Sequence, residues 1–328
     1  MSATATEPML RARDVVVEYA RKGADPVRAV AGVSVEVGAG EVLGIVGESG
    51  CGKSTLARAI TGLTRTAAGH IEFAGTTVTP LRRRRRPAEL LPLQMVFQDP
   101  YTSLNPRRRV GPQIAEVIRA HARARGVARP DAAGERAEIE DVLDRVGLPA
   151  SAADRYPHQF SGGQRQRIAI ARVLAGRPRM IVADEPVSAL DASAQAQVAN
   201  LLRDITRESG IALAFISHDL AVVGALADRV AVMYLGRVVE TGPIEQIWNR
   251  PAHPYTQALL GAVPTPDGTG RRPLALAGEV PDPSNPPTGC RFHPRCPIAV
   301  DRCRTDEPAA ERSGPDASVA CWEATPGA

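Results

Sequence analysis

The sequence predicts an α/β fold built on a mostly parallel β-sheet, and three observations lead to this prediction. Short apolar runs of strand length alternate with segments of helical periodicity, as in a parallel sheet covered by helices. A stretch from about residue 111 to 175 has helical character, so a helical insert interrupts the alternation. Beyond about residue 250 this periodicity is lost, and four of the five cysteines follow. We therefore expect a main domain over residues 1–250 and an extension over residues 251–328.

The first elements are strands. Val15–Val17 has strand character, and Val33–Val37 alternates apolar and polar residues, which is typical of a strand with one polar face. Glu41–Val46 is apolar almost throughout, so we expect a buried strand that leads into a Gly-rich turn and then a helix from about Ser54 to Ile60. Two further short strands are expected at Ile71–Phe73 and Met95–Phe97.

The helical insert and the second half of the main domain follow the same logic. In the insert, one helical face carries an i, i+3, i+4, i+7 series that Gly147 would end, namely Ile139, Val142, Leu143 and Val146. The alternation then returns, with strands at Met180–Ala183 and Ile211–Ile216, a helix at about Asp191–Glu208, another helix, and a strand pair at Val230–Tyr234 and Arg237–Glu240. Pro264–Gly289 is rich in Pro and Gly and is expected to be an extended linker.

Composition excludes several classes of protein. Apolar residues make up 44% and charged residues 23%, which is ordinary for a globular chain and excludes general disorder or a fibrous repeat. The net charge of +4 becomes −1 without the five arginines of Arg82–Arg86, a run that we expect to be a solvated loop; no nucleic-acid partner is expected. No apolar run reaches the roughly 18 residues of a membrane span, and the N-terminus lacks a signal-peptide pattern. We expect a cytoplasmic protein with reduced cysteines.

One Gly-rich segment has the spacing of a phosphate-binding loop. It matches G-x-x-x-x-G-K-S/T and lies between the expected buried strand and a helix, so backbone N–H groups and the helix dipole would face an anion. Lys53, one of only two lysines, would reach the β- and γ-phosphates, and the Ser54 hydroxyl would ligate Mg²⁺. The residues expected to contact nucleotide are Gly47, Glu48, Ser49, Gly50, Cys51, Gly52, Lys53, Ser54 and Thr55.

Two further segments extend this chemistry. The apolar strand at Met180 ends in Asp184 and Glu185, which places one carboxylate to bind the metal and the other to polarise an attacking water. Ser161 and Gln164 fit the S-x-x-Q capping box at a helix start, and Gly162 and Gly163 between them leave backbone N–H groups bare. We expect a second anion site there.

Taken in order, these motifs resemble those of ABC-type ATPases. They are the phosphate loop, Val96–Asp99, Ser161–Gln164, Ala183–Glu185, Ser188–Asp191 and Ser217–Asp219. The resemblance implies a P-loop NTPase ABC cassette, with a RecA-like parallel core, added antiparallel strands, a helical subdomain at about residues 99–177, and here a small cysteine-rich C-terminal extension. It also implies a head-to-tail dimer that binds ATP between the phosphate loop of one cassette and the Ser161 segment of the other.

The same resemblance implies roles for individual residues. Catalysis would depend on Glu185 as general base, with His218 and Gln98. Mg²⁺ would be held by Ser54, Gln98 and Asp184. Across the dimer interface, ATP would meet Ser161, Gly162, Gly163, Gln164 and Asp191. Tyr19 would stack on adenine, although packing is nearly as good an interpretation of this residue.

Four longer segments are similar to the ATP-binding subunits of oligopeptide and dipeptide importers, namely Phe97–Pro106, Arg155–Phe160, Met233–Gly236 and His253–Thr256. This similarity implies an ATP-hydrolysing subunit on the cytoplasmic face of the membrane. Its partners would be a second ATPase subunit (a copy or a paralogue), two transmembrane permease subunits and an extracytoplasmic substrate-binding protein. The alternatives are an importer of nickel or another small solute, and a soluble ABC ATPase.

The cysteines of the extension form a second constellation. Four cysteines lie in a Pro-rich tail with little hydrophobic core of its own, namely Cys290, Cys296, Cys303 and Cys321. This suggests that a bound metal stabilises the tail. Their spacings match neither zinc ribbons nor bacterial ferredoxins. The resemblance to peptide importers implies a [4Fe–4S] cluster; zinc, bound by four thiolates or with His293, and unliganded thiols remain the alternatives.

Overall fold

The structure is a computed structural model that describes residues 7–81, 86–263, 278–314 and 316–324. Two sequence predictions fall wholly or partly outside these residues. Four arginines of the run Arg82–Arg86 are not described, and neither are residues 264–277 of the expected linker Pro264–Gly289.

The main sheet has eight strands in the order β11-β12-β10-β9-β3-β8-β7-β6. The five strands β9, β3, β8, β7 and β6 are parallel to one another, whereas β10, β12 and β11 pair in antiparallel fashion at the other side of the sheet. This confirms the predicted α/β fold with a mostly parallel sheet. The bounds are β3 Val42–Val46, β6 Leu93–Val96, β7 Met180–Asp184, β8 Ala212–Ile216, β9 Arg229–Tyr234, β10 Arg237–Pro243, β11 Glu311–Gly314 and β12 Ala317–Val319.

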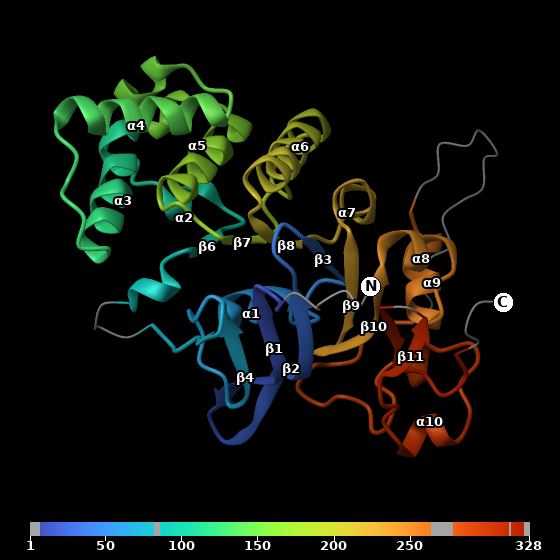
Figure 1. Cartoon of the computed structure of the whole chain (residues 1–328). Coiled ribbons are helices and arrows are strands. Elements are labelled where there is room, and N and C mark those ends of the chain that lie inside the picture. The colour runs from blue at the N-terminus through green and yellow to red at the C-terminus, as the bar shows by residue number, and fades with distance from the viewer. Residues whose placement is uncertain (1–6, 82–85, 264–277, 315, 325–328) are drawn as a thin grey trace, which may run out of the picture.

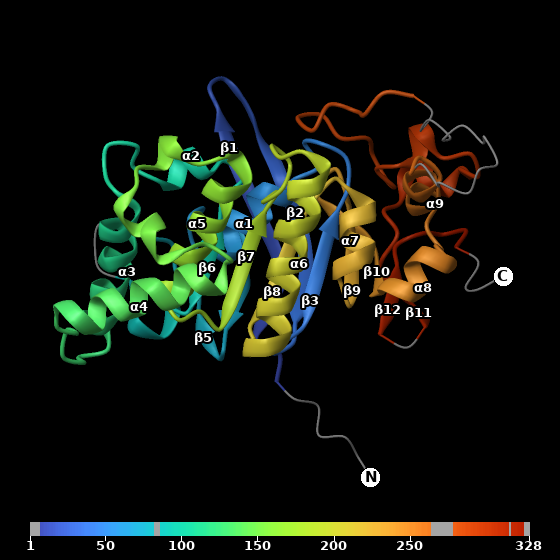
Figure 2. The ribbon, with the colours of Figure 1, turned by 90° about the horizontal axis from the view of Figure 1, so that it is seen from above.

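The two faces of this sheet bury alternate residues of the same strands, because successive side chains point to opposite sides. On β3, Leu43 and Ile45 pack with α1 (Lys53–Ile60) and the N-terminal strands, while Val42 and Val46 pack toward the other helices. Both views show α6 (Ala192–Ser209) and α7 (Leu220–Leu226) on the face opposite α1 (Figures 1 and 2). The near-continuous apolar strands of the sequence therefore form the middle layer of the domain.

A second, antiparallel sheet has the order β2-β1-β4-β5. Its strands are β1 Leu10–Arg21, β2 Ala24–Val37, β4 Ala68–Phe73 and β5 Thr76–Thr77. The hairpin of β1 and β2 is much longer than the apolar segments Val15–Val17 and Val33–Val37 predicted. Pairing across the hairpin satisfies the backbone of polar stretches, and ion pairs such as Arg11–Glu36 join the two strands.

The helical insert forms a separate lobe beside the edge strand β6 (Figure 1). It contains α2 Pro100–Ser103, α3 Val110–Ala124, α4 Ala132–Arg145 and α5 Gly162–Ala175. The predicted apolar face is confirmed, because α4 buries Ile139, Val142 and Leu143. Gly147 follows with a φ of 69°, a conformation that glycine adopts without strain and that suits the end of a helix.

The chain beyond β10 packs against the main domain and rejoins its sheet. Its elements are α8 Ile244–Asn249, α9 Pro254–Gly261, a 3₁₀ turn at His293–Arg295, α10 Arg302–Thr305, β11 and β12. Strand β12 pairs with β10 through Glu240↔Val319 and Thr241↔Ser318. The C-terminal residues therefore continue the sheet of the main domain at the side of β10.

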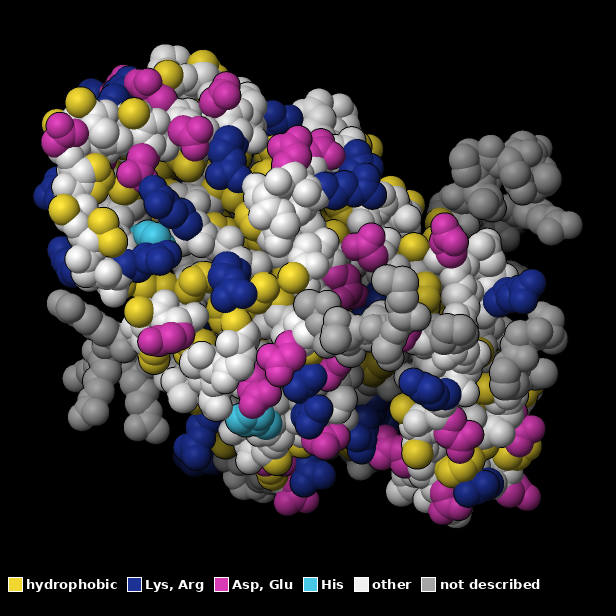
Figure 3. Space-filling view, viewed as in Figure 1, with side chains coloured by type: hydrophobic (Ala, Val, Ile, Leu, Met, Phe, Trp, Pro, Cys, Tyr) yellow, Lys and Arg dark blue, Asp and Glu magenta, His cyan; other side chains and the backbone are white. Residues whose placement is uncertain are grey.

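The surface seen in Figure 3 mixes acidic and basic side chains over both the helical lobe and the C-terminal region. Among the described residues, no helix combines the length and the apolar character that a membrane span requires.

Candidate nucleotide site

The phosphate loop joins the buried strand β3 to α1, as the sequence predicted. Lys53 is the first residue of α1, and its side chain is buried within the loop. Its Nζ donates to the carbonyl oxygens of Gly47 at 2.8 Å and Glu48 at 2.9 Å. The loop therefore closes around an ammonium group at a helix N-terminus, and both features attract anions.

Two glycines of this loop are required by close backbone approach. A Cβ at Gly47 would lie 2.1 Å from the carbonyl oxygen of Met233, and one at Gly52 would lie 2.1 Å from that of Ala29. Their φ angles are 149° and 104°, which L side chains rarely adopt. The curvature of the loop thus depends on residues without side chains.

Ser54 and Asp184 meet beside the loop. The Ser54 hydroxyl donates to Oδ1 of Asp184 at 2.7 Å, which brings α1 and the end of β7 together across 130 residues of sequence. Burial raises the pKa of Asp184; the Ser54 hydrogen bond opposes this shift and the neighbouring Glu185 adds to it. A hydroxyl and a carboxylate oxygen at this spacing fit the oxygen ligands that Mg²⁺ prefers.

Glu185 lies between Gln98 and His218. Gln98 Nε2 donates to Oε2 of Glu185 at 3.0 Å, and His218 Nδ1 is 3.4 Å from Oε1. Glu185 has a φ of 46°, and its N–H donates to the carbonyl of Ile216 at 3.0 Å, so a backbone contact from β8 supports the strained conformation. The structure therefore brings the three predicted catalytic residues together.

One member of this cluster was missed as a site residue. Gln98 Nε2 also lies 3.3 Å from the Ser188 hydroxyl, which itself donates to the Glu185 carbonyl at 3.1 Å. Ser188 was recognised only as part of a motif, because a serine three residues after Glu185 carries no signal of its own. It links Gln98 to the backbone of Glu185.

The second predicted anion site lies at the adjoining N-termini of α5 and α6. The capping box is confirmed, because Ser161 Oγ accepts from the Gln164 N–H and Gln164 Oε1 accepts from the Ser161 N–H. Asp191 caps α6 by accepting from the Ala194 N–H at 2.9 Å. A cavity of about 260 Å³ lies here. Among the described residues, its lining includes Ser161, Gly163 and Gln164 but no residue of the phosphate loop. Within one chain, this cavity is therefore separate from the phosphate loop.

Two predicted residues flank the loop. Tyr19, on β1, is 43% exposed, and its hydroxyl lies 3.5 Å from that of Thr55 in α1. Its ring is thus available beside the phosphate loop. Cys51 is buried, and burial raises the pKa of its thiol more than the Lys53 ammonium, 3.7 Å from its Sγ, lowers it, so the thiol is not activated as a thiolate.

The four C-terminal cysteines are neighbours but do not form a metal site in this arrangement. Burial raises the pKa of Cys290 to about 11, and the other three cysteines add to the shift. The Cys290 N–H donates to the Cys303 carbonyl at 2.9 Å. His293 Nδ1 lies 3.0 Å from the Cys290 carbonyl oxygen. Over the described part of the chain, no group of three or more His, Cys, Asp or Glu side chains could hold a metal ion. The arrangement does not support the expected [4Fe–4S] cluster.

Sequence analysis also missed how the C-terminal region reaches the phosphate loop. Arg295 forms an ion pair with Glu48, and the Tyr255 hydroxyl accepts from the Glu48 N–H at 2.9 Å. No motif marks Arg295, and no sequence signal pairs residues 247 positions apart.

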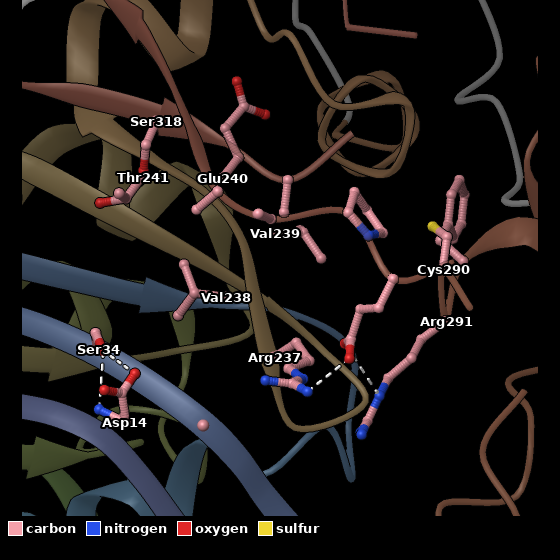
Figure 4. Close-up of a pocket in the computed structure, with 17 residues that line it drawn as sticks. Asp14, Ser34, Arg237, Val238, Val239, Glu240, Thr241, Cys290, Arg291 and Ser318 are labelled. Atoms are coloured by element: carbon pink, nitrogen blue, oxygen red, sulfur yellow. Dashed lines mark hydrogen bonds and ion pairs between the residues drawn. The ribbon is translucent and has the colours of Figure 1, made fainter. Parts of the chain in front are cut away.

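A cavity of about 470 Å³ lies between β2, β10 and the C-terminal region. Figure 4 shows Arg237 and Arg291 both directed at one acidic side chain, which is Glu307. Its lining includes none of the predicted nucleotide residues, so this cavity is separate from the phosphate loop.

A phosphate loop, paired carboxylates beyond a parallel strand and a capped helix apart from them define an ABC-type ATPase cassette. The family model "ABC transporter" matches residues 30–188. The dimeric post-hydrolysis structure of the cassette MJ0796, bound to ADP and Pi, aligns with a TM-score of 0.63 and 26% identity over 72% of this chain and 99% of that one. CbiO1 from Clostridium perfringens, part of the complex cbiONQ, aligns with 0.62 and 27% over 74% and 91%.

The C-terminal region and the curated relatives narrow this class. The model "Oligopeptide/dipeptide transporter, C-terminal region" matches residues 239–303. The probable peptide ABC transporter ATP-binding protein y4tS of Sinorhizobium fredii is 51% identical over 92% of this chain and 84% of its own length. The oligopeptide transport ATP-binding protein OppF of Escherichia coli is 47% identical over 92% and 89%. The chain belongs to the family of ATP-binding proteins of ABC-type peptide transporters.

Proposed function

We propose that this chain is the ATP-hydrolysing subunit that powers a membrane importer of di- and oligopeptides. The observation that carries the proposal is the convergence of Gln98, Glu185 and His218 beyond the Ser54–Asp184 pair, next to a phosphate loop. The peptide cargo is inferred from the relatives, which are named as peptide, di/tripeptide and oligopeptide transport ATP-binding proteins.

In the proposed mechanism, Lys53 exchanges its loop carbonyls for the β- and γ-phosphates of ATP. Ser54, Asp184 and Gln98 would hold Mg²⁺, which would supply positive charge beside the γ-phosphoryl oxygens. Glu185 accepts a proton from the attacking water, a contribution typically worth about 10²–10⁴-fold in rate. Gln98 and His218 hold both oxygens of that carboxylate, so its orientation toward the water is set before the reaction.

The second anion site requires a partner cassette. Because the cavity at Ser161, Gly163 and Gln164 lies apart from the phosphate loop, we propose that it caps ATP bound to a second ATPase subunit, either a copy or a paralogue. Asp191 at the start of α6 would face the same interface. Two transmembrane permease subunits and an extracytoplasmic binding protein would complete the importer, and this chain would lie on the cytoplasmic face of the membrane.

We further propose the division into a nucleotide-binding domain at 1–250, with its helical subdomain at about 99–177, and a cysteine-rich extension at 251–328. The extension carries four cysteines, which equals the number that ligates a [4Fe–4S] cluster. Their described positions would have to close to bind one. Absorbance of anaerobically purified protein, before and after iron and sulfide are added, tests this part by itself.

The function is tested in vesicles that contain this chain together with its proposed permease subunits and binding protein. Dipeptides and longer peptides should stimulate ATP hydrolysis and accumulate inside, whereas the Glu185→Gln complex should do neither. Stimulation by nickel chelates alone would overturn the peptide assignment. ATP hydrolysis by a chain that never associates with membrane subunits would overturn the transport role.

A further inference from the structure

A residue of the C-terminal region makes a two-point contact with the phosphate loop. Arg295 Nη1 donates to Oε2 of Glu48 at 2.7 Å, and Nη2 donates to Oε1 at 3.1 Å. The Arg295 side chain is 3% exposed and that of Glu48 is 23% exposed, so water screens the pair poorly. A bidentate guanidinium–carboxylate pair also fixes orientation, which a single ammonium contact does not.

An aromatic cluster holds Arg295 in this position. Phe292, buried at the start of the same turn, packs edge-on against Tyr234 with ring centroids 5.3 Å apart and lies 5.4 Å from Tyr255. Nη1 of Arg295 is 3.4 Å from the Tyr234 hydroxyl. Tyr234 is the last residue of β9 and Tyr255 the second residue of α9, so the cluster attaches the turn to the cassette.

Glu48 is thereby held at both its backbone and its side chain. Tyr255 accepts from its N–H and Arg295 binds its carboxylate, while its carbonyl accepts from Lys53. The ammonium that is to bind the phosphates therefore contacts the residue that Arg295 holds. A displacement of Glu48 would move the carbonyl oxygen that accepts a hydrogen bond from Lys53 Nζ.

Charge gives the contact a further consequence. A carboxylate in a loop that binds a triphosphate repels its ligand, and a paired guanidinium cancels that repulsion. An ion pair of low exposure is in itself weak evidence for stability, because its desolvation offsets much of the attraction. Its position on the phosphate loop therefore points to a role in binding.

We propose that Arg295 is a positioning residue for ATP: from the C-terminal region, it neutralises Glu48 and holds the phosphate loop in the form that accepts a nucleoside triphosphate. The proposal deepens the proposed function and rests on it, because it concerns the same loop. It makes the C-terminal region part of the nucleotide site.

A double-mutant cycle tests the proposal on the full-length chain. Fluorescent methylanthraniloyl-ATP and -ADP are titrated into wild type, Arg295→Met, Glu48→Gln and the double variant, and each variant is also followed by thermal unfolding. Arg304→Met is the matched control, since it removes an exposed arginine of α10 in the same region.

Arg295→Met should raise the Kd of the ATP analogue about 10- to 100-fold, the effect of one poorly screened charge near the phosphates. The rise should be smaller for the ADP analogue, and smaller than about threefold when Glu48→Gln is already present, because the two residues act as one pair. Arg304→Met should stay within about twofold of wild type, as expected for a surface change. A role confined to folding predicts equal losses for both nucleotides and in both backgrounds.

Two results would overturn the proposal: a Kd for Arg295→Met within about twofold of wild type, or the same rise with and without Glu48→Gln. If Arg295→Met does not fold, Arg295→Lys replaces it, which keeps the charge and loses the two-point contact; its smaller rise must likewise shrink with Glu48→Gln. Failure of the wild type to bind ATP would instead refute the proposed function.

Discussion

Replacing Glu185 by Gln isolates one chemical property of the site, the ability to accept a proton. The amide has nearly the same shape as the carboxylate. The amide oxygen can still accept from Gln98 Nε2, which lies 3.0 Å from Oε2 of Glu185 in the unsubstituted protein. The amide nitrogen can face His218 Nδ1, which lies 3.4 Å from Oε1 of Glu185. The backbone support from Ile216 at 3.0 Å does not depend on the side chain. We therefore expect the fold and ATP binding to persist.

The expected cost falls on the chemical step. General-base catalysis contributes about 10²–10⁴-fold, so turnover should fall by that factor, which corresponds to a barrier about 3–5 kcal/mol higher. The loss should appear in kcat, since the carboxylate acts on water in the transition state and not on ATP in the ground state. The Kd for ATP should change by less than about threefold, as for a nearly isosteric replacement.

Phosphate release at saturating Mg-ATP measures kcat for the purified complex, and titration with a fluorescent ATP analogue measures the Kd. The matched control is Glu208→Gln, an exposed residue near the end of α6 that should leave kcat within about twofold of wild type. Full turnover by Glu185→Gln would refute its role as base. An equal loss of ATP affinity and turnover would show that the carboxylate serves binding or structure.

Three further predictions follow from other contacts. Lys53→Ala removes the loop ammonium and should weaken ATP binding strongly in the same titration; an unchanged Kd would count against the phosphate-loop assignment. Phe292→Ala opens the aromatic cluster and should lower the free energy of unfolding by about 3–5 kcal/mol in denaturant melts, whereas Ile298→Ala, at a 47% exposed residue, should cost less than about 0.5 kcal/mol. Burial lowers the pKa of His253 to about 4, so the unfolded chain binds the extra proton between about pH 6.5 and 4 and stability should fall as pH falls through that window, by up to about 3 kcal/mol. His253→Asn can still accept from the Tyr255 N–H at the start of α9, so its stability should depend less on pH there; an identical pH profile would exclude His253 as the cause.

The elements that the sequence predicted best depend on nearby residues. The phosphate loop lies between β3 and α1 because an apolar strand, a run of glycines and a helix follow one another directly. The Ser161–Gln164 capping box forms between residues three apart. The apolar face of α4 has the expected register, because its residues repeat with the period of the helix.

Local sequence patterns of this kind did not predict contacts between residues that are far apart in the chain. The pairing of β12 with β10, which joins the C-terminal region to the main sheet, has no sequence signature in strands this short. The Arg295–Glu48 pair depends on Phe292 reaching Tyr234 and Tyr255, which belong to three separate elements. The relative placement of the four cysteines is likewise set by the turns that carry them.

The sequence by itself determined which chemical groups this protein brings to a nucleotide and on which local elements they lie, because short motifs fold under short-range sterics and hydrogen bonding. Only the tertiary structure decided that Gln98 and His218 contact opposite oxygens of Glu185 and that Arg295 of the C-terminal region pairs with Glu48 of the phosphate loop. These contacts arise from the packing of elements far apart in the chain, and packing depends on side-chain shape and burial that no spacing of residues records.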